Sequence, residues 1–192
     1  TKQNPFFIDN EPRAEYVKMD TDMLSLIVKY KEDDYTFTSA TTYAKEQIQK
    51  YDYVPIPNYI NLGIDLRIDI QEVTQEFRIK KEFDDSDLLV GAFYSDKLQF
   101  DYLENQTYYT IGSSKNFLTN PDENIALFTQ YKYYFNDNYS LMGGLRYQTT
   151  KRSFTRELDN IHASSDTTWT HMLPTISFSY LGNDNSNTYF TY

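Results

Sequence analysis

Carboxylates, which could transfer protons, are plentiful in this sequence, and the group that we weigh for acid–base chemistry is Glu72 and Glu76 with Arg78. Even numbers of residues separate the three positions. Because every second side chain of a β-strand points to the same face, they would form one charged row. We interpret this row as mutually paired charges in contact with water or another domain. We assign no catalytic residue and predict that the protein is not an enzyme.

Metal and nucleotide sites find little support in the sequence. The two histidines, His162 and His171, do not have a standard metal-ligand spacing, and the chain has no Cys. Gly182–Asn187 superficially resembles an Asp/Asn calcium loop but lacks the downstream Glu and the central Gly. No Gly-x-Gly-x-x-Gly motif occurs, and we interpret Gly143 and Gly144 as relieving crowding in a strand. We therefore expect no metal and no cofactor.

Aromatic residues in the polar stretches of the chain are candidates for ligand contact. They could line an apolar vestibule, or they could pack loop against loop. Nothing in the sequence ranks one above another, so the ligand-binding residues are unknown at this stage. The group consists of Tyr53, Tyr59, Tyr102, Tyr108, Tyr109 and Trp169.

The composition excludes two classes of protein and leaves a third open. A formal net charge of -10 argues against a nucleic-acid partner, which would need clustered Lys and Arg. A mean hydropathy of -0.67 and the absence of a long apolar run exclude helical membrane spans. Transmembrane β-strands need an apolar residue only at every second position, and 19 Tyr and 13 Phe suit a water–lipid boundary. No secretory signal opens the chain, so we expect either a processed protein or an internal piece.

Short polar turns recur at equal intervals, at Glu32–Asp34, Asp84–Ser86 and Asn136–Asn138, and a fourth follows at Gly182–Ser186. Between them the chain makes long polar excursions. Tight periplasmic turns that alternate with long outer loops are typical of bacterial outer-membrane barrels. We therefore predict an all-β, antiparallel transmembrane barrel segment of about eight strands. The predicted long connections are Lys50–Gln71, Gln99–Glu123 and Thr149–Thr168, and the segment through Asp20 is expected to belong to another loop.

The alternation of side chains assigns one face of several strands to lipid. In Tyr139–Gln148 one row is aromatic at both ends and apolar between them, as expected of a strand that crosses a bilayer. Ile125–Phe135 and Leu173–Tyr180 also alternate. The predicted lipid-facing or interface residues are Ile125, Leu127, Tyr131, Tyr133, Phe135, Tyr139, Leu141, Leu145, Tyr147, Ile176, Phe178 and Tyr180.

Two further hairpins are predicted earlier in the chain. Leu24–Lys31 pairs with Tyr35–Ala44, and Glu72–Lys80, whose charged row should face a wet lumen, pairs with Leu88–Ser95. The last of these strands is apolar on both faces, so alternation does not decide whether Val90 or Phe93 points outward. A local alternative is a helix over Tyr43–Tyr51, supported by the Glu46 and Lys50 pair.

Five segments resemble strands of TonB-dependent outer-membrane receptors in the same order along the chain. They are YTFTSATTY (Tyr35–Tyr43), QEFRI (Gln75–Ile79), LVGAFYSDK (Leu89–Lys97), ENIALFTQYKYYFNDNYSLMGGLRYQ (Glu123–Gln148) and LPTISFSY (Leu173–Tyr180). This resemblance implies a larger barrel of about 22 strands with a plugged lumen, residing in the bacterial cell outer membrane. It also implies import of a scarce ligand, such as a ferric siderophore or another iron chelate, with energy supplied through TonB.

Residues 1–192 would then be part of a receptor barrel domain, because the chain contains no recognisable plug domain and no TonB-contacting segment. The expected partners are outer-membrane lipid, the remaining barrel and plug, TonB through a segment not present here, and a small iron chelate. Two alternatives stay open. One is a complete small eight-stranded barrel with a structural or adhesin role, and the other is a soluble β-sheet binding module.

Overall fold

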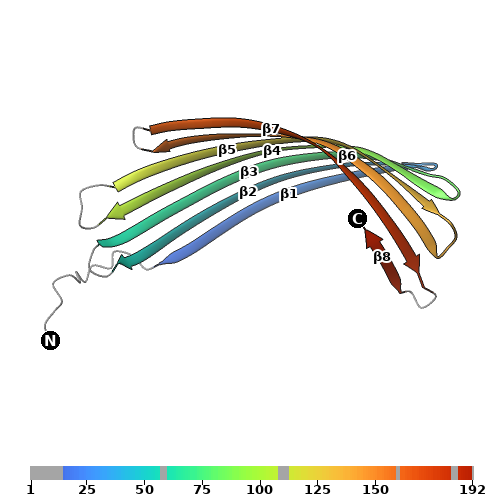
Figure 1. The fold of residues 1–192 in the computed structure, drawn as a ribbon, viewed down its shortest axis with the longest axis horizontal. Coiled ribbons are helices and arrows are strands. Elements are labelled where there is room, and N and C mark those ends of the chain that lie inside the picture. The colour runs from blue at the N-terminus through green and yellow to red at the C-terminus, as the bar shows by residue number, and fades with distance from the viewer. Residues whose placement is uncertain (1–14, 57–59, 108–112, 159–160, 183–185, 192) are drawn as a thin grey trace.

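The computed structural model describes residues 15–56, 60–107, 113–158, 161–182 and 186–191. One antiparallel sheet contains all eight strands, and each strand pairs with its neighbours in chain order (Figure 1). The all-β prediction is confirmed. The strands are β1 (Tyr16–Glu32), β2 (Tyr35–Ile56), β3 (Ile60–Glu82), β4 (Ser86–Thr107), β5 (Ser113–Tyr134), β6 (Tyr139–Leu158), β7 (Ile161–Leu181) and β8 (Asn187–Thr191).

Three short turns lie where the polar clusters predict them, between β1 and β2, β3 and β4, and β5 and β6. The fourth predicted turn, Gly182–Ser186, lies mostly outside the described residues. The β1–β2 turn is closed by Asp33, whose φ of 49° lies in the left-handed region that Asp tolerates better than most residues. In the β5–β6 turn the Asn136 side-chain oxygen accepts hydrogen bonds from the backbone amides of Asn138 (2.9 Å) and Tyr139 (3.0 Å). This side-chain cap by Asn136, and the tolerance of Asp33 for a positive φ, explain why Asn and Asp mark these two turns in the sequence.

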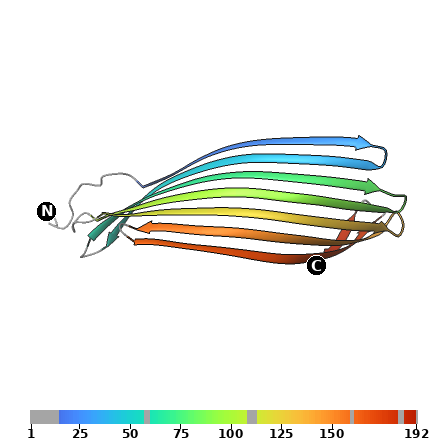
Figure 2. The ribbon, with the colours of Figure 1, turned by 90° about the horizontal axis from the view of Figure 1, so that it is seen from above.

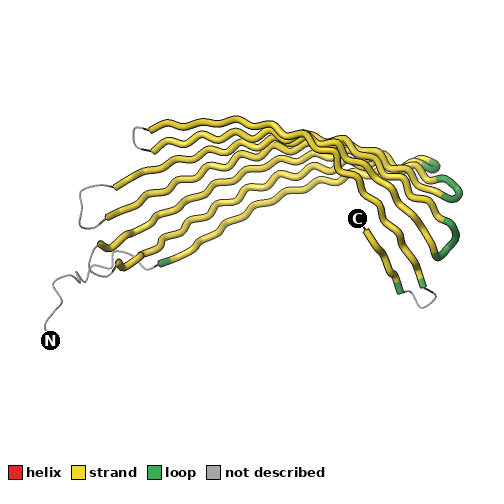
Figure 3. The backbone as a smooth tube through the Cα atoms, viewed as in Figure 1, coloured by secondary structure: helices red, strands yellow, loops and turns green. Residues whose placement is uncertain are grey.

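The predicted long loops are wrong over most of their length. β2 and β3 pair without interruption from Lys50 opposite Leu66 to Ile56 opposite Ile60, and β4 and β5 pair as far as Gln106 opposite Ser113. The third excursion is strand as well, because Thr149 to Leu158 pairs with β7. One of these stretches does carry a strand signal that the prediction overlooked, because residues 60–70 of β3 are apolar at every second position. The many polar residues at the alternate positions gave the stretch the overall polarity of a loop. Figure 3 shows strand along nearly the whole described chain.

Two smaller expectations are also corrected. β1 begins at Tyr16, so residues 16–20 are strand rather than loop, and residues 1–14 lie outside the described part. The helical alternative over Tyr43–Tyr51 is wrong, because this segment lies inside β2 and pairs on both sides. Tertiary pairing with β1 and β3 supplies backbone hydrogen bonds that a single i,i+4 charge pair does not match.

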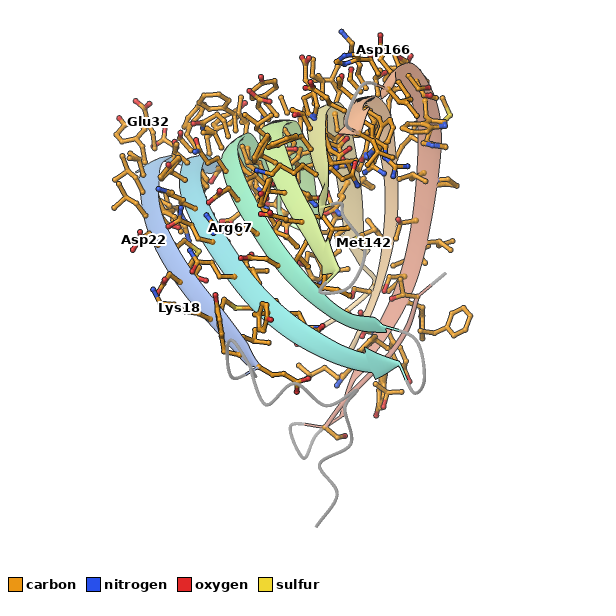
Figure 4. All side chains as sticks on the ribbon, turned by 90° about the vertical axis from the view of Figure 1, so that its left-hand side faces the viewer. Lys18, Asp22, Glu32, Arg67, Met142 and Asp166 are labelled. Carbon is orange, nitrogen blue, oxygen red and sulfur yellow. The ribbon has the colours of Figure 1, made fainter. Side chains whose placement is uncertain are left out.

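The sheet is a single layer without a hydrophobic core of the ordinary kind. Among the described residues, Tyr51 and Ala126 are the buried hydrophobic side chains, while many Leu, Ile, Val and aromatic side chains are exposed. Side chains leave both faces of the layer, as Figure 4 shows. No described helix is long and apolar enough to cross a membrane. A soluble sandwich would cover one of these faces with a second sheet, and the described chain has none.

The sheet is curved, and its two borders are open. β1 forms one border and β8 the other, and among the described residues these two strands do not pair with each other (Figure 2). β8 pairs only with Ser177 to Leu181 of β7. A closed eight-stranded barrel would join β1 to the last strand. The open sheet therefore weighs against the alternative of a complete small barrel.

Candidate functional site

A hollow identifies the concave face of the sheet. It has a volume of about 510 Å³ and spans β3 to β7, where Glu76, Arg78, Phe128, Gln130 and Arg146 are among its lining residues. One hollow can be bordered by five neighbouring strands only if the face that carries these side chains is concave. We call this face the inner wall and the opposite one the convex face.

The predicted lipid-facing residues within the strands belong to the convex row. They alternate with inner-wall residues in β5, β6 and β7, except Phe135, which lies in the β5–β6 turn. Their side chains are largely uncovered: Leu127 is 61% exposed, Ile176 50% and Leu145 40%, whereas Ala126 beside Leu127 is 1% exposed. The sequence pattern thus identifies a continuous face, and its contact with lipid stays a prediction.

A charge-free belt runs across the convex face of β1 to β7. Strand pairing places the convex residues of seven strand segments at one level across the sheet. These segments are Leu24–Tyr30, Tyr35–Tyr43, Val73–Ile79, Leu88–Tyr94, Ile125–Tyr133, Tyr139–Tyr147 and Met172–Tyr180. Within these ranges the convex face carries no Asp, Glu, Lys, Arg or His. Beyond the belt, charged convex residues resume at Asp22, Lys45, Asp96, Glu123 and Lys151.

Aromatic rings line both margins of the belt. Near the short turns, Tyr139 lies 4.8 Å from Tyr180 between ring centroids, and Lys81 extends over the Tyr35 ring at 4.9 Å. The far margin carries Tyr43, Tyr94 and Tyr147. Tyr147 lies eight positions after Tyr139, which corresponds to about 27 Å along the strand. If the strand is tilted, this length spans about 20 Å of bilayer thickness.

The structure defines the two faces of Leu88–Ser95 in β4, which the alternation of side chains in the sequence does not assign. Val90 pairs with Thr129 and is 48% exposed on the convex face. Phe93 pairs with Ala126 and therefore lies on the inner wall. Its ring is contacted there by Arg146 from β6, which explains why β4 is apolar on both faces.

Arg146 lines the hollow and contacts two aromatic rings, Phe128, which also lines it, and Phe93 beside it. The Arg146 guanidinium carbon lies 5.2 Å from the Phe93 ring centre and 5.8 Å from the Phe128 ring centre. Its Nε donates a 2.8 Å hydrogen bond to Gln148. Gly91 provides the room, because a Cβ at that position would lie 2.2 Å from the Phe128 ring. Sequence reasoning missed this cluster, since its members come from three strands.

The charged row of β3 pairs with itself and its neighbours, as predicted. Arg78 hydrogen-bonds to Glu76, and Lys80 contacts Glu82 (2.8 Å) and Asp87 (3.1 Å). The Tyr134 hydroxyl of β5 donates to the same Asp87 at 2.7 Å. This arrangement consists of ion pairs on the inner wall near the short turns and offers no isolated carboxylate set beside a nucleophile.

The strands continue past the belt as a polar wall, which we call the extension. Within it, Arg152 of β6 binds Asp122 of β5 at 2.5 Å, and this hydrogen bond raises the pKa of the guanidinium above its usual range. A hydrogen bond to Glu104 likewise raises the pKa of the Tyr102 phenol. The two contacts link or order side chains on the wall.

The remaining candidates do not assemble into one site. Tyr102 lies in the convex row, whereas Trp169 lies on the inner wall opposite Thr150. The side chains of Tyr53, Tyr59, Tyr108 and Tyr109 lie outside the described residues. His162 and His171 belong to β7 rather than to a loop, and nine residues of strand put them on opposite faces. Residues 183–185 of the calcium-like segment are also outside the described part.

The interpretation of the paired glycines is only partly supported. At Gly144 an added Cβ would lie 3.2 Å from the Gln130 side chain, so crowding is real on the inner wall. At Gly143 nothing lies within 4 Å of such an atom, and the prediction is wrong there. Within the described ranges, the convex face carries no second layer that could crowd the backbone.

Comparison with known proteins identifies one family. The family model described as "TonB dependent receptor-like, beta-barrel" matches residues 2–192. No curated protein sequence matches the chain.

Solved structures share the fold at low sequence identity. The ferric yersiniabactin uptake receptor FyuA from Yersinia pestis is 16% identical, with a TM-score of 0.77 over 92% of this chain and 28% of that one. The siderophore receptor PiuA from Acinetobacter baumannii is 12% identical, with a TM-score of 0.73 over 92% and 32%. The ferric-catecholate import receptor Fiu from E. coli is 11% identical, with a TM-score of 0.73 over 92% and 33%. The chain thus spans about a third or less of the length of these receptors.

Proposed function

Because the chain belongs to the TonB-dependent receptor-like β-barrel family, we propose that it forms part of the barrel wall of an outer-membrane importer. Members of this family are receptors and transporters of the bacterial outer membrane. In this proposal the convex belt contacts lipid and the inner wall faces a plug domain located elsewhere in the protein. The extension carries the outer rim above the membrane, where ligand is captured.

The observation that carries this proposal is the charge-free belt. Each charged side chain at the bilayer centre of a barrel costs about 2–4 kcal/mol for Arg or Lys, so a lipid-facing row excludes charge while the lumen-facing row tolerates it. The inner wall at the same level contains Arg78, Arg146 and Glu76. A barrel wall between lipid and a wet lumen accounts for both faces together.

The transported ligand is proposed at the level of a class, and an iron chelate is the first class to test. FyuA, PiuA and Fiu are named as receptors for iron chelates or siderophores. Their low identity supports the fold alone, so the ligand rests on family membership. We assign the capture and plug-contact steps to the wall and extension, and TonB-driven plug movement to segments outside this chain.

Uptake by cells tests the proposal. A strain that lacks the full-length gene should lose uptake of one radiolabelled iron chelate from a panel, and the intact gene should restore it in a TonB-dependent manner. Unchanged uptake of every chelate in iron-limited medium would reject the ligand class. Recovery of the protein in the cytosolic or inner-membrane fraction would reject the location.

A further inference from the structure

An aromatic groove lies on the convex row of the extension, beyond the belt. Its volume is about 220 Å³, and Phe100, Phe117, Thr119, Thr155 and Glu157 line it. These residues come from β4, β5 and β6, where Phe100 pairs with Thr119 and Phe117 pairs with Glu157. We call this surface the outer groove. It is separate from the inner-wall hollow because its residues occupy the opposite face of the same strands.

The aromatic rings of the outer groove are held in place by their neighbours. Phe117 lies between Phe100 and Tyr102, with centroid distances of 6.2 Å and 5.1 Å. Tyr102 is fixed in turn by its hydrogen bond to Glu104 and by Arg67, whose guanidinium carbon lies 5.8 Å from its ring centre. Phe100 nevertheless remains 38% exposed, so a ring face is available to a ligand.

The polar groups beside the rings define what the outer groove can bind. Glu157 forms no ion pair with any described residue, and its carboxylate can only accept hydrogen bonds when ionised. Thr119 and Thr155 add hydroxyls that donate and accept. A phosphate or another anion would be repelled by Glu157, whereas a neutral polyhydroxylated ligand would donate to it. A pyranose ring also presents C–H groups, whose positive hydrogens favour the negative face of an aromatic ring.

The level of the outer groove indicates where such a ligand comes from. Phe100 lies six residues beyond Tyr94 of the upper belt margin, which corresponds to about 20 Å along β4 and about 15 Å above the margin for a tilted strand. The outer groove also points away from the lumen. On the membrane placement proposed above, it therefore faces the saccharides that outer-leaflet glycolipids carry above their acyl chains.

We propose that the outer groove binds a neutral sugar of an outer-leaflet glycolipid by stacking it on Phe100 and Phe117. Glu157 and the two threonines accept and donate hydrogen bonds to its hydroxyl groups. The volume lies below the 300–1,000 Å³ of usual small-molecule sites, so the groove takes a ring or two of a longer saccharide. Such contacts anchor the protruding wall to the cell surface independently of import.

The experiment uses the full-length receptor that contains this chain, purified in a detergent without a sugar headgroup. Isothermal titration calorimetry measures binding of the acyl-free oligosaccharide released from the host's outer-leaflet glycolipid. The variant carries Phe100→Ala and Phe117→Ala together. The matched control is Trp169→Ala, which removes an aromatic ring from the opposite face of the extension. Circular dichroism verifies that each variant retains its β-sheet signal.

We expect the double variant to bind the oligosaccharide about tenfold more weakly or not at all, and the control to bind like the parent. Equal binding by the double variant, or no binding by the parent, would overturn the proposal. If the parent receptor bound maltoheptaose as tightly as the glycolipid oligosaccharide, the glycolipid would be overturned as the source of the ligand. Fractionation of cells tests the membrane placement separately. A wrong membrane placement can therefore be distinguished from a lack of sugar binding.

Discussion

On a single strand, the stability cost of a charged substitution depends on the face that the side chain occupies. Ile176 lies on the convex belt opposite Gly143, and its neighbour Ser177 lies on the inner wall at the same depth. In the full-length receptor we expect Ile176→Arg to lower the free energy of unfolding by about 2–4 kcal/mol and Ser177→Arg to cost less than about 1 kcal/mol. Denaturant titration in lipid vesicles measures both. Equal costs at the two positions would contradict the assignment of the faces.

Two glycines offer a second contrast at the same scale. A Cβ at Gly91 would meet the Phe128 ring and lie 2.8 Å from the backbone oxygen of Phe77, which is less able to move. We expect Gly91→Ala to destabilise the receptor by about 1–3 kcal/mol through overpacking.

Gly143→Ala is the matched control for this contrast. Its new methyl group has open space on the convex face, and Ala also restricts the unfolded chain more than Gly. We expect no loss and a gain of up to about 1 kcal/mol in the same unfolding assay. A larger loss at Gly143 than at Gly91 would show that the crowding lies on the convex face instead.

At the scale of one element, β6 should report its two environments as a period of two. Spin labels placed singly from Tyr139 to Gln148 should show high oxygen accessibility at odd positions, because oxygen concentrates in lipid. A water-soluble nickel chelate should instead reach the even positions from the lumen. A flat profile for both reagents would contradict a strand that separates lipid from water.

The extension makes a separate prediction about strand length. Ile64–Gln71 and Lys97–Glu104 are paired strand segments above the belt, within stretches that the sequence analysis predicts as long loops. In the full-length receptor we expect their backbone amides to exchange with deuterium about as slowly as those of β6 within the belt, because ladder hydrogen bonds protect them. Exchange at the rate of a free loop would show that the strands end at the membrane.

At the scale of the whole molecule, an open sheet with two unpaired borders and an uncovered apolar belt needs partners. Such edges and faces associate with other chains in water. We expect the isolated 192-residue chain to form aggregates in detergent-free buffer rather than a folded monomer, as measured by size-exclusion chromatography with light scattering. A stable monomer with β-sheet circular dichroism would favour the soluble binding module instead.

The sequence by itself determined the features that depend on neighbouring residues. Asn136 marks its turn because its side chain accepts hydrogen bonds from turn amides, and Asp33 marks the β1–β2 turn because Asp tolerates a positive φ. The belt strands could be predicted because one face excludes charge at every second position, as in Tyr139–Gln148. Family resemblance could be read from the same strands and their order.

Only the tertiary structure decided what depends on pairing between distant residues. The strands of the extension persist because β2, β3, β4 and β5 satisfy one another's backbone groups, and this pairing sets how far they run. Part of β3 could also have been predicted locally, because Ile64–Ile70 is apolar at every second position. The faces of β4 became clear only when Phe93 was found beside Arg146 of another strand. Phe100 and Phe117 likewise form a groove because strand register brings them together. Register is a long-range property, and local alternation does not encode it.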